Sequence, residues 1–330
     1  MQRMHAHVTV HKGLLFLVVI VCLLTACNTL SATQNGRTMV QHIILPGMGC
    51  GKHSPLSPGS SANETIVSGG LKRSYRLHIP RGYRNEIAHA LVLNFHGHGS
   101  NAIVQERFTG MSQLADRYSF IVAYPQGTTG LDRHTGWNTG PSNFPHVDDV
   151  GFTSDLIDHL QFTLCVDPHR IYAVGFSNGG GMANVLACKL SGRIAAFAIV
   201  SGSMHPVANG CHPAQPVSLL EIHGTGDKTA PYVGNSLNDD ELPITQWLAD
   251  WAVRDDCASN PTVFLQQSRV TGEQWNSCRD NATIIHYRIY GGKHTWPRTG
   301  FAHDADGQVI NASSIIWQFF WTHQLKSPPI

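Results

Sequence analysis

Charged residues are scarce in this chain of 330 residues, since Asp, Glu, Lys and Arg together make up 14% and the formal net charge is +1. A nucleic-acid-binding protein needs a basic patch to meet the phosphates, and this composition argues against one. The body also lacks an internal repeat or a break in composition that would divide it. Its length suits one large domain better than two small ones. We therefore expect a monomer with one main domain that recognises an uncharged or weakly acidic molecule and binds no nucleic acid.

The chain has no convincing membrane span, because its apolar stretch at residues 14–24 is too short to cross a bilayer comfortably as a helix. Arg3 and Lys12 precede this stretch, so it is typical of an export signal. It ends in Leu-Thr-Ala-Cys at Cys27, which resembles the lipobox of bacterial lipoproteins, where the cysteine becomes the lipidated first residue after cleavage. We expect residues 1–27 to be a signal peptide and Cys27 to be lipidated, with ordinary secretion as the alternative.

Two polar stretches follow the export signal. Residues 31–36 and 54–63 contain Ser, Gly or Pro in a composition that suits a tether rather than a core. We expect residues 28–65 to form a flexible tether and N-terminal segment, and residues 66–330 to form a single domain.

Cys-x-x-Cys spacing is absent, which argues against a redox or metal-binding cysteine motif. Apart from Cys22 and Cys27, the body keeps an even set of cysteines that would form disulfides in an oxidising compartment. These are Cys50, Cys165, Cys188, Cys211, Cys257 and Cys278. The sequence leaves most of the pairing open, but it favours Cys257 with Cys278 because both lie in a polar insertion between two predicted strands.

Residues 172–180 read Tyr-Ala-Val-Gly-Phe-Ser-Asn-Gly-Gly, a β-rich run that enters a Gly-x-Ser-x-Gly turn and then a helix of small residues. This pattern is typical of a nucleophile elbow, in which the serine sits on a strained turn between strand and helix. Gly175 and Gly179 would be needed there because a side chain would collide with the neighbouring backbone. The alternative is an ordinary turn with an exposed serine. We expect Ser177 to be a nucleophile.

An acid and a base for this serine follow later in the chain, each just after a predicted strand. Residues 217–222 form an apolar strand that leads to Asp227, and residues 284–290 form another that leads to His294. The chain order serine, acid, histidine is that of α/β-hydrolases. Because the chain holds 20 His, position rather than residue type selects His294. Asp148 and Asp149 are rival acids, but they precede a predicted helix, where carboxylates normally serve the helix N-terminus.

An earlier apolar strand at residues 90–95 ends in the turn His-Gly-His-Gly-Ser. α/β-Hydrolases place the second donor of the oxyanion hole on such a turn. The expected donors are the backbone amides of Asn178 and of His98, or Gly99 in place of His98. A metal pair formed by His96 and His98 is an alternative, but no Cys or carboxylate lies beside them at ligand spacing. We expect no metal and no cofactor.

At this point the chain resembles the secreted esterase family of feruloyl esterases, acetyl xylan esterases and polyhydroxybutyrate depolymerases. The resemblance extends from residue 48 to residue 322. The segments that carry it are residues 73–80 (RSYRLHIP), 96–97 (HG), 124–127 (YPQG), 136–138 (GWN), 148–152 (DDVGF), 166–168 (VDP), 170–172 (RIY), the turn around Ser177, 223–227 (HGTGD) and 294–297 (HTWP).

This resemblance implies an α/β-hydrolase fold, with a mostly parallel central sheet and helices on both faces. Predicted strands that alternate with helical runs at residues 154–164, 179–190 and 315–323 agree with it. The resemblance also implies extracellular hydrolysis of esters, most like the feruloyl and carbohydrate esterases that act on plant cell-wall polymers. A polyhydroxybutyrate depolymerase is the nearest alternative. A non-catalytic binding protein on a hydrolase scaffold is another, which the complete set of Ser177, Asp227 and His294 counts against.

Aromatic residues near the predicted catalytic loops are candidates for the substrate pocket. They are Trp137, Phe144, Tyr232 and Trp296. Trp and Tyr also commonly brace long loops against a sheet, which is the alternative for each of them. Trp296 is the best candidate because it lies two residues from His294.

Overall fold

The computed structural model describes residues 31–34, 37–40, 48–140, 144, 147–235, 241–298 and 310–326. The chain divides into two compact units, Met1–Ile44 and Leu45–Ile330. In the first, strands β1 (Ser31–Gln34) and β2 (Arg37–Val40) form an antiparallel hairpin. The expected signal peptide and Cys27 lie outside the described residues. Among the helices that the structure describes, none is both long and apolar enough to cross a membrane.

The second unit is built on one sheet of ten strands in the order β12-β13-β14-β11-β10-β9-β5-β6-β4-β3. Its central strands, from β14 to β6, run parallel, and an antiparallel pair flanks them on each side. The strands are β3 (Ser60–Ser68), β4 (Leu71–Ile79), β5 (His89–Phe95), β6 (Ile121–Pro125), β9 (Val166–Phe176), β10 (Ala196–Val200), β11 (Ser218–Gly224), β12 (Thr262–Gln266), β13 (Val270–Trp275) and β14 (Ile284–Ile289). A separate short hairpin pairs β7 (Thr128–Thr129) with β8 (Thr135–Gly136).

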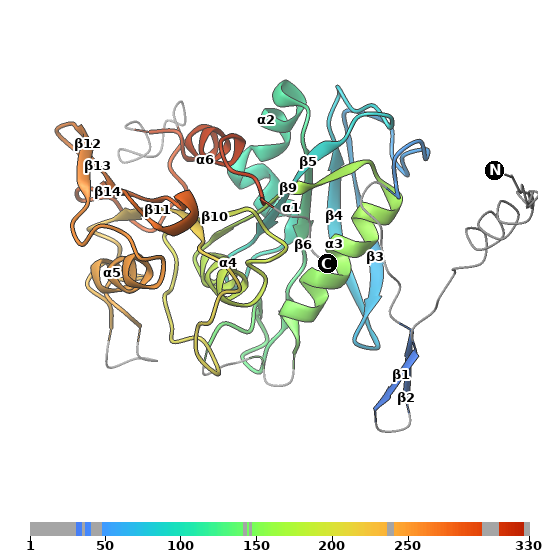
Figure 1. Cartoon of the computed structure of the whole chain (residues 1–330), viewed down its shortest axis with the longest axis horizontal. Coiled ribbons are helices and arrows are strands. Elements are labelled where there is room, and N and C mark those ends of the chain that lie inside the picture. Colours follow the sequence, from blue (N-terminus) through green and yellow to red (C-terminus); the bar gives the residue numbers. More distant parts are fainter. Residues whose placement is uncertain are drawn as a thin grey trace, which may run out of the picture. The chain divides into compact units, whose positions relative to one another are not determined.

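Helices cover both faces of this sheet, as Figure 1 shows. One face carries α3 (Asp149–Thr163), α4 (Asn178–Lys189) and α5 (Ile244–Arg254), and the other carries α1 (Ala102–Thr109), α2 (Met111–Tyr118) and α6 (Ala312–Trp321). A short 3-10 helix covers Arg279–Asn281. A hydrophobic core lies on each face of the sheet. The central strands contribute side chains to both cores, because successive side chains of a strand point to opposite faces. Leu91 and Leu93 of β5 join the first core, and Val92 joins the second. The expected architecture is confirmed.

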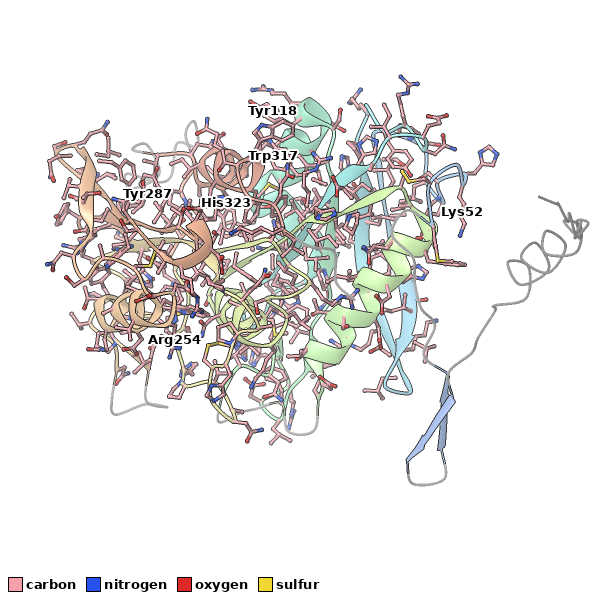
Figure 2. All side chains as sticks on the ribbon, viewed as in Figure 1. Lys52, Tyr118, Arg254, Tyr287, Trp317 and His323 are labelled. Atoms are coloured by element: carbon pink, nitrogen blue, oxygen red, sulfur yellow. A yellow bond between two sulfur atoms is a disulfide. The ribbon has the colours of Figure 1, made fainter. Side chains whose placement is uncertain are left out.

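Aromatic stacking fixes helix α6 on its face of the sheet. The Trp317 ring stacks on Phe120 at a centroid distance of 3.8 Å, and Figure 2 shows Trp317 beside Tyr118 at the end of α2. Tyr172 of β9 stacks on Phe320 at 4.6 Å. Stacked rings of this kind add to the stability gained from burial alone. These contacts pack helix α6 against strand β9 and the segment between α2 and β6.

Three disulfides link Cys50 with Cys165, Cys188 with Cys211, and Cys257 with Cys278. The predicted pairing of Cys257 with Cys278 is confirmed.

The compact domain starts earlier than the expected boundary at residue 66. Cys50 is bonded to Cys165, and β3 already pairs with β4 from Ser60 onwards. The prediction of a tether is therefore wrong for residues 48–65. Strand β3 lies at the edge of the sheet and is mostly polar and partly exposed, so its composition resembles that of a linker.

The parallel strands all end at one edge of the sheet. Strand β5 is followed in the chain by β6 on one side, whereas β9 lies on its other side. Open α/β sheets bind ligands at such a switch point, outside the carboxyl ends of the strands. The turns after β5, β9, β11 and β14 meet there, and they carry the residues singled out from the sequence.

Candidate active site

Ser177 stands on a tight turn between the last residue of β9 and the first of α4. Its backbone has φ 55° and ψ −123°, a region that non-glycine residues rarely occupy and that is associated with functional strain. A Cβ on Gly175 would lie 1.9 Å from the Gly179 carbonyl oxygen, and one on Gly179 would lie 2.3 Å from the Phe95 carbonyl oxygen. The strand, turn and helix therefore have the form expected of a nucleophile elbow. Both positions require glycine, because a Cβ there would clash with a backbone carbonyl oxygen.

Asp227 and His294 meet although they lie on different loops. His294 Nδ1 donates to Asp227 Oδ2 at 2.7 Å, while Asp227 Oδ1 accepts the amides of Thr229 and Ala230 at 2.8 and 2.9 Å. The His294 ring also lies 4.8 Å from the ring of Phe176, the residue before Ser177. The structure thus brings the predicted acid and base together beside the elbow.

A buried ionic group lies behind Asp227, and sequence reasoning did not find it. His223 is 1% exposed; its Nδ1 lies 2.9 Å from Glu221 Oε1, and its Nε2 lies 2.8 Å from the Ala230 carbonyl oxygen and 3.5 Å from Asp227 Oδ2. Both ring nitrogens therefore face acceptors, so both carry a proton. Burial opposes this charge, but Glu221 and Asp227 raise the pKa of His223 to about 10.

The group continues across the sheet from Glu221. His286 on β14 pairs with Glu221 in the strand register, and its Nδ1 lies 2.7 Å from Glu221 Oε2 at an angle poor for a hydrogen bond. Tyr232 Oη lies 2.9 Å from His286 Nε2 and accepts from Arg288 Nε at 2.9 Å. The one hint in the sequence was Glu221 itself, because a carboxylate inside an apolar strand must find buried partners.

Hydrogen bonds hold Asp227 in its ionised form. Burial favours the neutral acid, but donors from His223, His294 and the Ala230 amide outweigh it and lower the pKa of Asp227. An ionised Asp227 accepts a hydrogen bond from the Nδ1–H of His294, which leaves Nε2 as the nitrogen able to take a proton.

The turn after β5 lies directly against Ser177, since a Cβ on Gly97 would be 3.4 Å from Ser177 Cβ. His96 is fully buried; its Nε2 accepts the Gly127 amide at 3.0 Å, so its Nδ1 donates to the Gly97 carbonyl oxygen at 2.8 Å. Burial lowers the pKa of His96 to about 4, so the ring is neutral. Both ring nitrogens are occupied, and the alternative of a metal pair with His98 is therefore wrong.

The two expected oxyanion donors are on segments next to Ser177, because His98 follows Gly97 on the adjacent turn and Asn178 follows Ser177 in the chain. The Gly99 amide donates to the Thr135 carbonyl oxygen at 2.7 Å, so of the two candidates on this turn we retain His98. Asn178 is the first residue of α4, and the first amides of a helix have no partner within it. Its side chain accepts the Trp137 amide at 2.8 Å and donates to the Trp137 carbonyl oxygen at 3.2 Å. Asn178 thereby fixes the neighbouring loop to the elbow.

Three of the predicted pocket residues, Trp137, Trp296 and Phe144, are buried in the described structure. Trp137 is 0% exposed and donates from its indole to the His96 carbonyl oxygen at 2.8 Å, so it braces the turn after β5. Trp296 is 1% exposed and donates to Ser313 Oγ at 3.0 Å, which ties the His294 loop to α6. The prediction that these rings contact substrate is wrong. Tyr232 is half-buried, and its hydroxyl belongs to the buried group behind Asp227.

Two aromatic rings outside the predicted set, those of Phe176 and Phe108, lie near His294. Phe176 and Phe108 are both half-buried, and their centroids are 5.1 Å apart with Phe176 against His294. Phe176 sits inside the Gly-x-Ser-x-Gly motif, so its position beside the nucleophile could have been expected from the sequence. Phe144, one of the predicted pocket residues, is buried, with its ring 6.4 Å from that of His98.

Asp148 and Asp149 have the structural roles expected of them. Asp148 caps α3 by accepting the Gly151 amide at 2.7 Å. Asp149 is buried, pairs with Arg73 at 2.7 Å and accepts the Asn138 amide at 2.9 Å. The second contact holds the loop that carries Trp137.

The family model described as esterase PHB depolymerase matches residues 73–233. Feruloyl esterase B of Piromyces equi is 32% identical over 225 residues, which cover 66% of this chain and 41% of that protein, so the chain spans less than half of this relative. Feruloyl esterase C of Emericella nidulans is 30% identical over 205 residues, covering 59% of this chain and 73% of that one. Among solved structures, the acetyl xylan esterase from Aspergillus awamori matches with a TM-score of 0.55 at 14% identity, covering 79% of this chain and 99% of that one. The predicted α/β-hydrolase fold is thereby confirmed, and the chain belongs to the esterase family that joins the feruloyl esterases with the polyhydroxybutyrate depolymerases.

Proposed function

We propose that this protein is a serine carboxylic ester hydrolase. The observation that carries the proposal is the 2.7 Å hydrogen bond from His294 Nδ1 to Asp227, made beside the strained Ser177 turn. A nucleophile, a base and an orienting acid on separate loops form the constellation used for acyl transfer.

In the first half of the reaction, Ser177 Oγ attacks the carbonyl carbon of the ester while His294 Nε2 takes the hydroxyl proton. Asp227 holds the imidazole in the required tautomer and balances its charge. The amides of His98 and Asn178 stabilise the tetrahedral oxyanion, and each such donor contributes about 2.7 to 4 kcal/mol to lowering the barrier. The intermediate then expels the alcohol, which takes the proton from His294, and leaves an acyl group on Ser177.

In the second half, water attacks the acyl-enzyme while His294 removes its proton. The tetrahedral intermediate collapses, Ser177 leaves with the proton from His294, and the carboxylic acid is released. The balance is one water consumed for each ester bond cleaved.

We propose esters of plant cell-wall carbohydrates, such as feruloyl esters, as the substrate class. The names of the similar proteins support this class. So do Phe176, whose ring lies against that of His294, and Phe108, whose ring lies against Phe176, because they offer flat faces to a phenolic acyl group. A hydroxyalkanoate unit has no such face. Depolymerisation of polyhydroxybutyrate is the second candidate, because the matching family model carries that description.

A non-catalytic binding protein would keep the fold without the chemistry. The intact Ser177, Asp227 and His294 count against this class, since a decayed enzyme is expected to have lost at least one of them.

The test is an ester panel on purified wild type and variants. Ser177→Ala should lower kcat for methyl ferulate by about 10⁶, and Asp227→Asn by about 10⁴, because the latter mainly loses tautomer control. Wild type should cleave methyl ferulate with a higher kcat/KM than a hydroxybutyrate oligomer. Residual activity above a few per cent in Ser177→Ala would remove this serine as nucleophile, and the reverse preference between the two esters would favour the depolymerase.

Two matched controls accompany these variants. Ser314→Ala changes a serine on helix α6 and should leave kcat unchanged. Asp148→Asn keeps a side chain able to cap α3 and should also have little effect. Greater damage from Asp148→Asn than from Asp227→Asn would overturn the assignment of the acid.

We also propose that the protein acts outside the cytoplasm, tethered through a lipidated Cys27. The three disulfides support an oxidising compartment. The lipobox-like end of the export signal supports the anchor.

A further inference from the structure

Three metal-ligating side chains meet on the surface next to the turn after β5. His98 lies on that turn, and Asp132 and His134 lie at the tip of the β7–β8 hairpin. His98 Nε2 lies 2.7 Å from Asp132 Oδ2, and His134 Nδ1 lies 3.7 Å from the same oxygen. One ligand atom from each residue lies within 4.8 Å of the other two. Two imidazoles and one carboxylate are a donor set for zinc and similar transition metals.

These distances fit a single ion with little movement. Zinc binds imidazole nitrogen at about 2.0 to 2.1 Å and carboxylate oxygen at about 2.0 to 2.2 Å, so two ligands of a tetrahedral site lie about 3 to 3.5 Å apart. The observed 2.7 and 3.7 Å lie on either side of this range. The third pair of ligand atoms, from His98 and His134, lies within 4.8 Å, so rotation of these exposed side chains would bring all three ligands to one ion.

Backbone hydrogen bonds hold the ligand-bearing segments in place. The Gly130 amide donates to the His134 carbonyl oxygen at 2.7 Å, which closes the hairpin tip. The His134 amide donates to Asp132 Oδ1 at 3.0 Å, which turns Oδ2 towards the two imidazoles. The Gly99 amide donates to the Thr135 carbonyl oxygen at 2.7 Å, so the hairpin is attached to the segment that carries His98.

The three side chains are open to solvent, with exposures of 41% for His98, 29% for Asp132 and 62% for His134. An ion can therefore enter directly, and three protein ligands leave at least one coordination position for water. The sequence did not indicate this site because Asp132 and His134 are far from His98 in the chain and only the fold brings them together.

We propose that His98, Asp132 and His134 form a binding site for one zinc-like transition-metal ion. The ion would join the hairpin tip to the segment of the candidate oxyanion donor. The rival explanation is a simple ion pair between His98 and Asp132, with His134 nearby and no affinity for metal.

Equilibrium dialysis of the metal-free mature protein against zinc chloride tests the proposal, with bound zinc measured per chain and Tm recorded in parallel. Wild type should bind one zinc per chain and gain in Tm. Asp132→Asn and His134→Ala should bind at least about ten-fold more weakly, because removing a ligand costs no less than removing an outer-shell partner. Both substitutions lie at an exposed hairpin tip, and an unchanged metal-free Tm would show that the variants are folded.

His53→Ala is the matched control, because His53 is an exposed histidine outside the cluster. It should bind zinc as wild type does, and magnesium should not replace zinc, because it prefers oxygen ligands. Failure of wild type to bind zinc stoichiometrically, or equal binding by wild type, Asp132→Asn and His134→Ala, would overturn the proposal. None of these readouts depends on ester hydrolysis, so the metal site and the proposed function succeed or fail separately.

Discussion

His223 has no access to solvent and lies between the carboxylates of Glu221 and Asp227. Removing one partner of a buried ion pair leaves an uncompensated charge and typically costs about 3 to 5 kcal/mol, whereas removing both can be nearly neutral. Because Asp227, the candidate catalytic acid, is one of the two carboxylates that face His223, loss of its charge should lower the stability of the fold.

The raised pKa of His223 predicts how stability depends on pH. Between about 6.5, the usual value for an unfolded His, and about 10, the folded protein holds a proton on His223 that the unfolded chain has released. Stability from this group is thus fully present below about pH 6.5 and falls as pH rises, by up to about 1.4 kcal/mol per pH unit. Urea unfolding of wild type at pH 6.5, 8 and 9.5 measures this slope.

A double variant isolates the contribution of His223 from other groups that titrate in this range. Glu221→Gln with His223→Gln removes both charges and should flatten the slope, while His53→Gln should keep it. An equally steep slope in the double variant would mean that His223 is not protonated in the folded protein.

The meeting of Asp227 and His294 near the Ser177 turn could be predicted, because each of these residues lies on the turn or loop after a strand that the sequence makes evident. The buried group behind Asp227 could not be predicted in full. Glu221 meets His286 only through the register of β11 with β14, and that register is set by tertiary packing. Sequence reasoning also misplaced Trp296, because proximity to His294 in the chain does not say to which face of the loop the ring points.

At the scale of elements, helix α4 can pass close to the end of β5 only because residue 179 is a glycine and has no side chain. A Cβ on Gly179 would lie 2.3 and 2.5 Å from the carbonyl oxygens of Phe95 and His96. Phe95 cannot easily retreat, because it is the last residue of β5 and pairs with Gly175 of β9. The edge strand β3 could not be predicted from the sequence, because its polar residues resemble those of a linker. Only its pairing with β4 in the structure identifies it as a strand.

Gly179→Ala should therefore destabilise the protein by about 3 kcal/mol or more, since the clash is with backbone. Gly192→Ala is the control, because its Cβ would meet nothing closer than the Ala214 Cβ at 3.9 Å and the change should stay within about 0.5 kcal/mol. Thermal unfolding of both variants provides the comparison. Similar Tm values for the two would show that the elbow tolerates a side chain at this position.

At the scale of the whole molecule, the proposed anchor predicts where the protein is found in a bacterial host. Cys27→Ser should release it from the membrane fraction or leave an uncleaved precursor, because the thiol is the acceptor of the lipid. Labelled fatty acid should enter wild type and fail to enter the variant. A mature N-terminus beyond Cys27 would instead establish plain secretion.

The Cys50–Cys165 disulfide has a mechanical consequence for a protein held at its N-terminus. Cys50 precedes β3, and Cys165 directly precedes β9, which is paired on both sides within the sheet. Tension on the N-terminal segment therefore reaches the domain through a covalent bond to a central strand and bypasses the hydrogen bonds that hold β3 at the edge. An anchored enzyme pulled by flow or by a bound polymer would keep its sheet closed, and the Ser177 turn at the far end of β9 would keep its geometry under load.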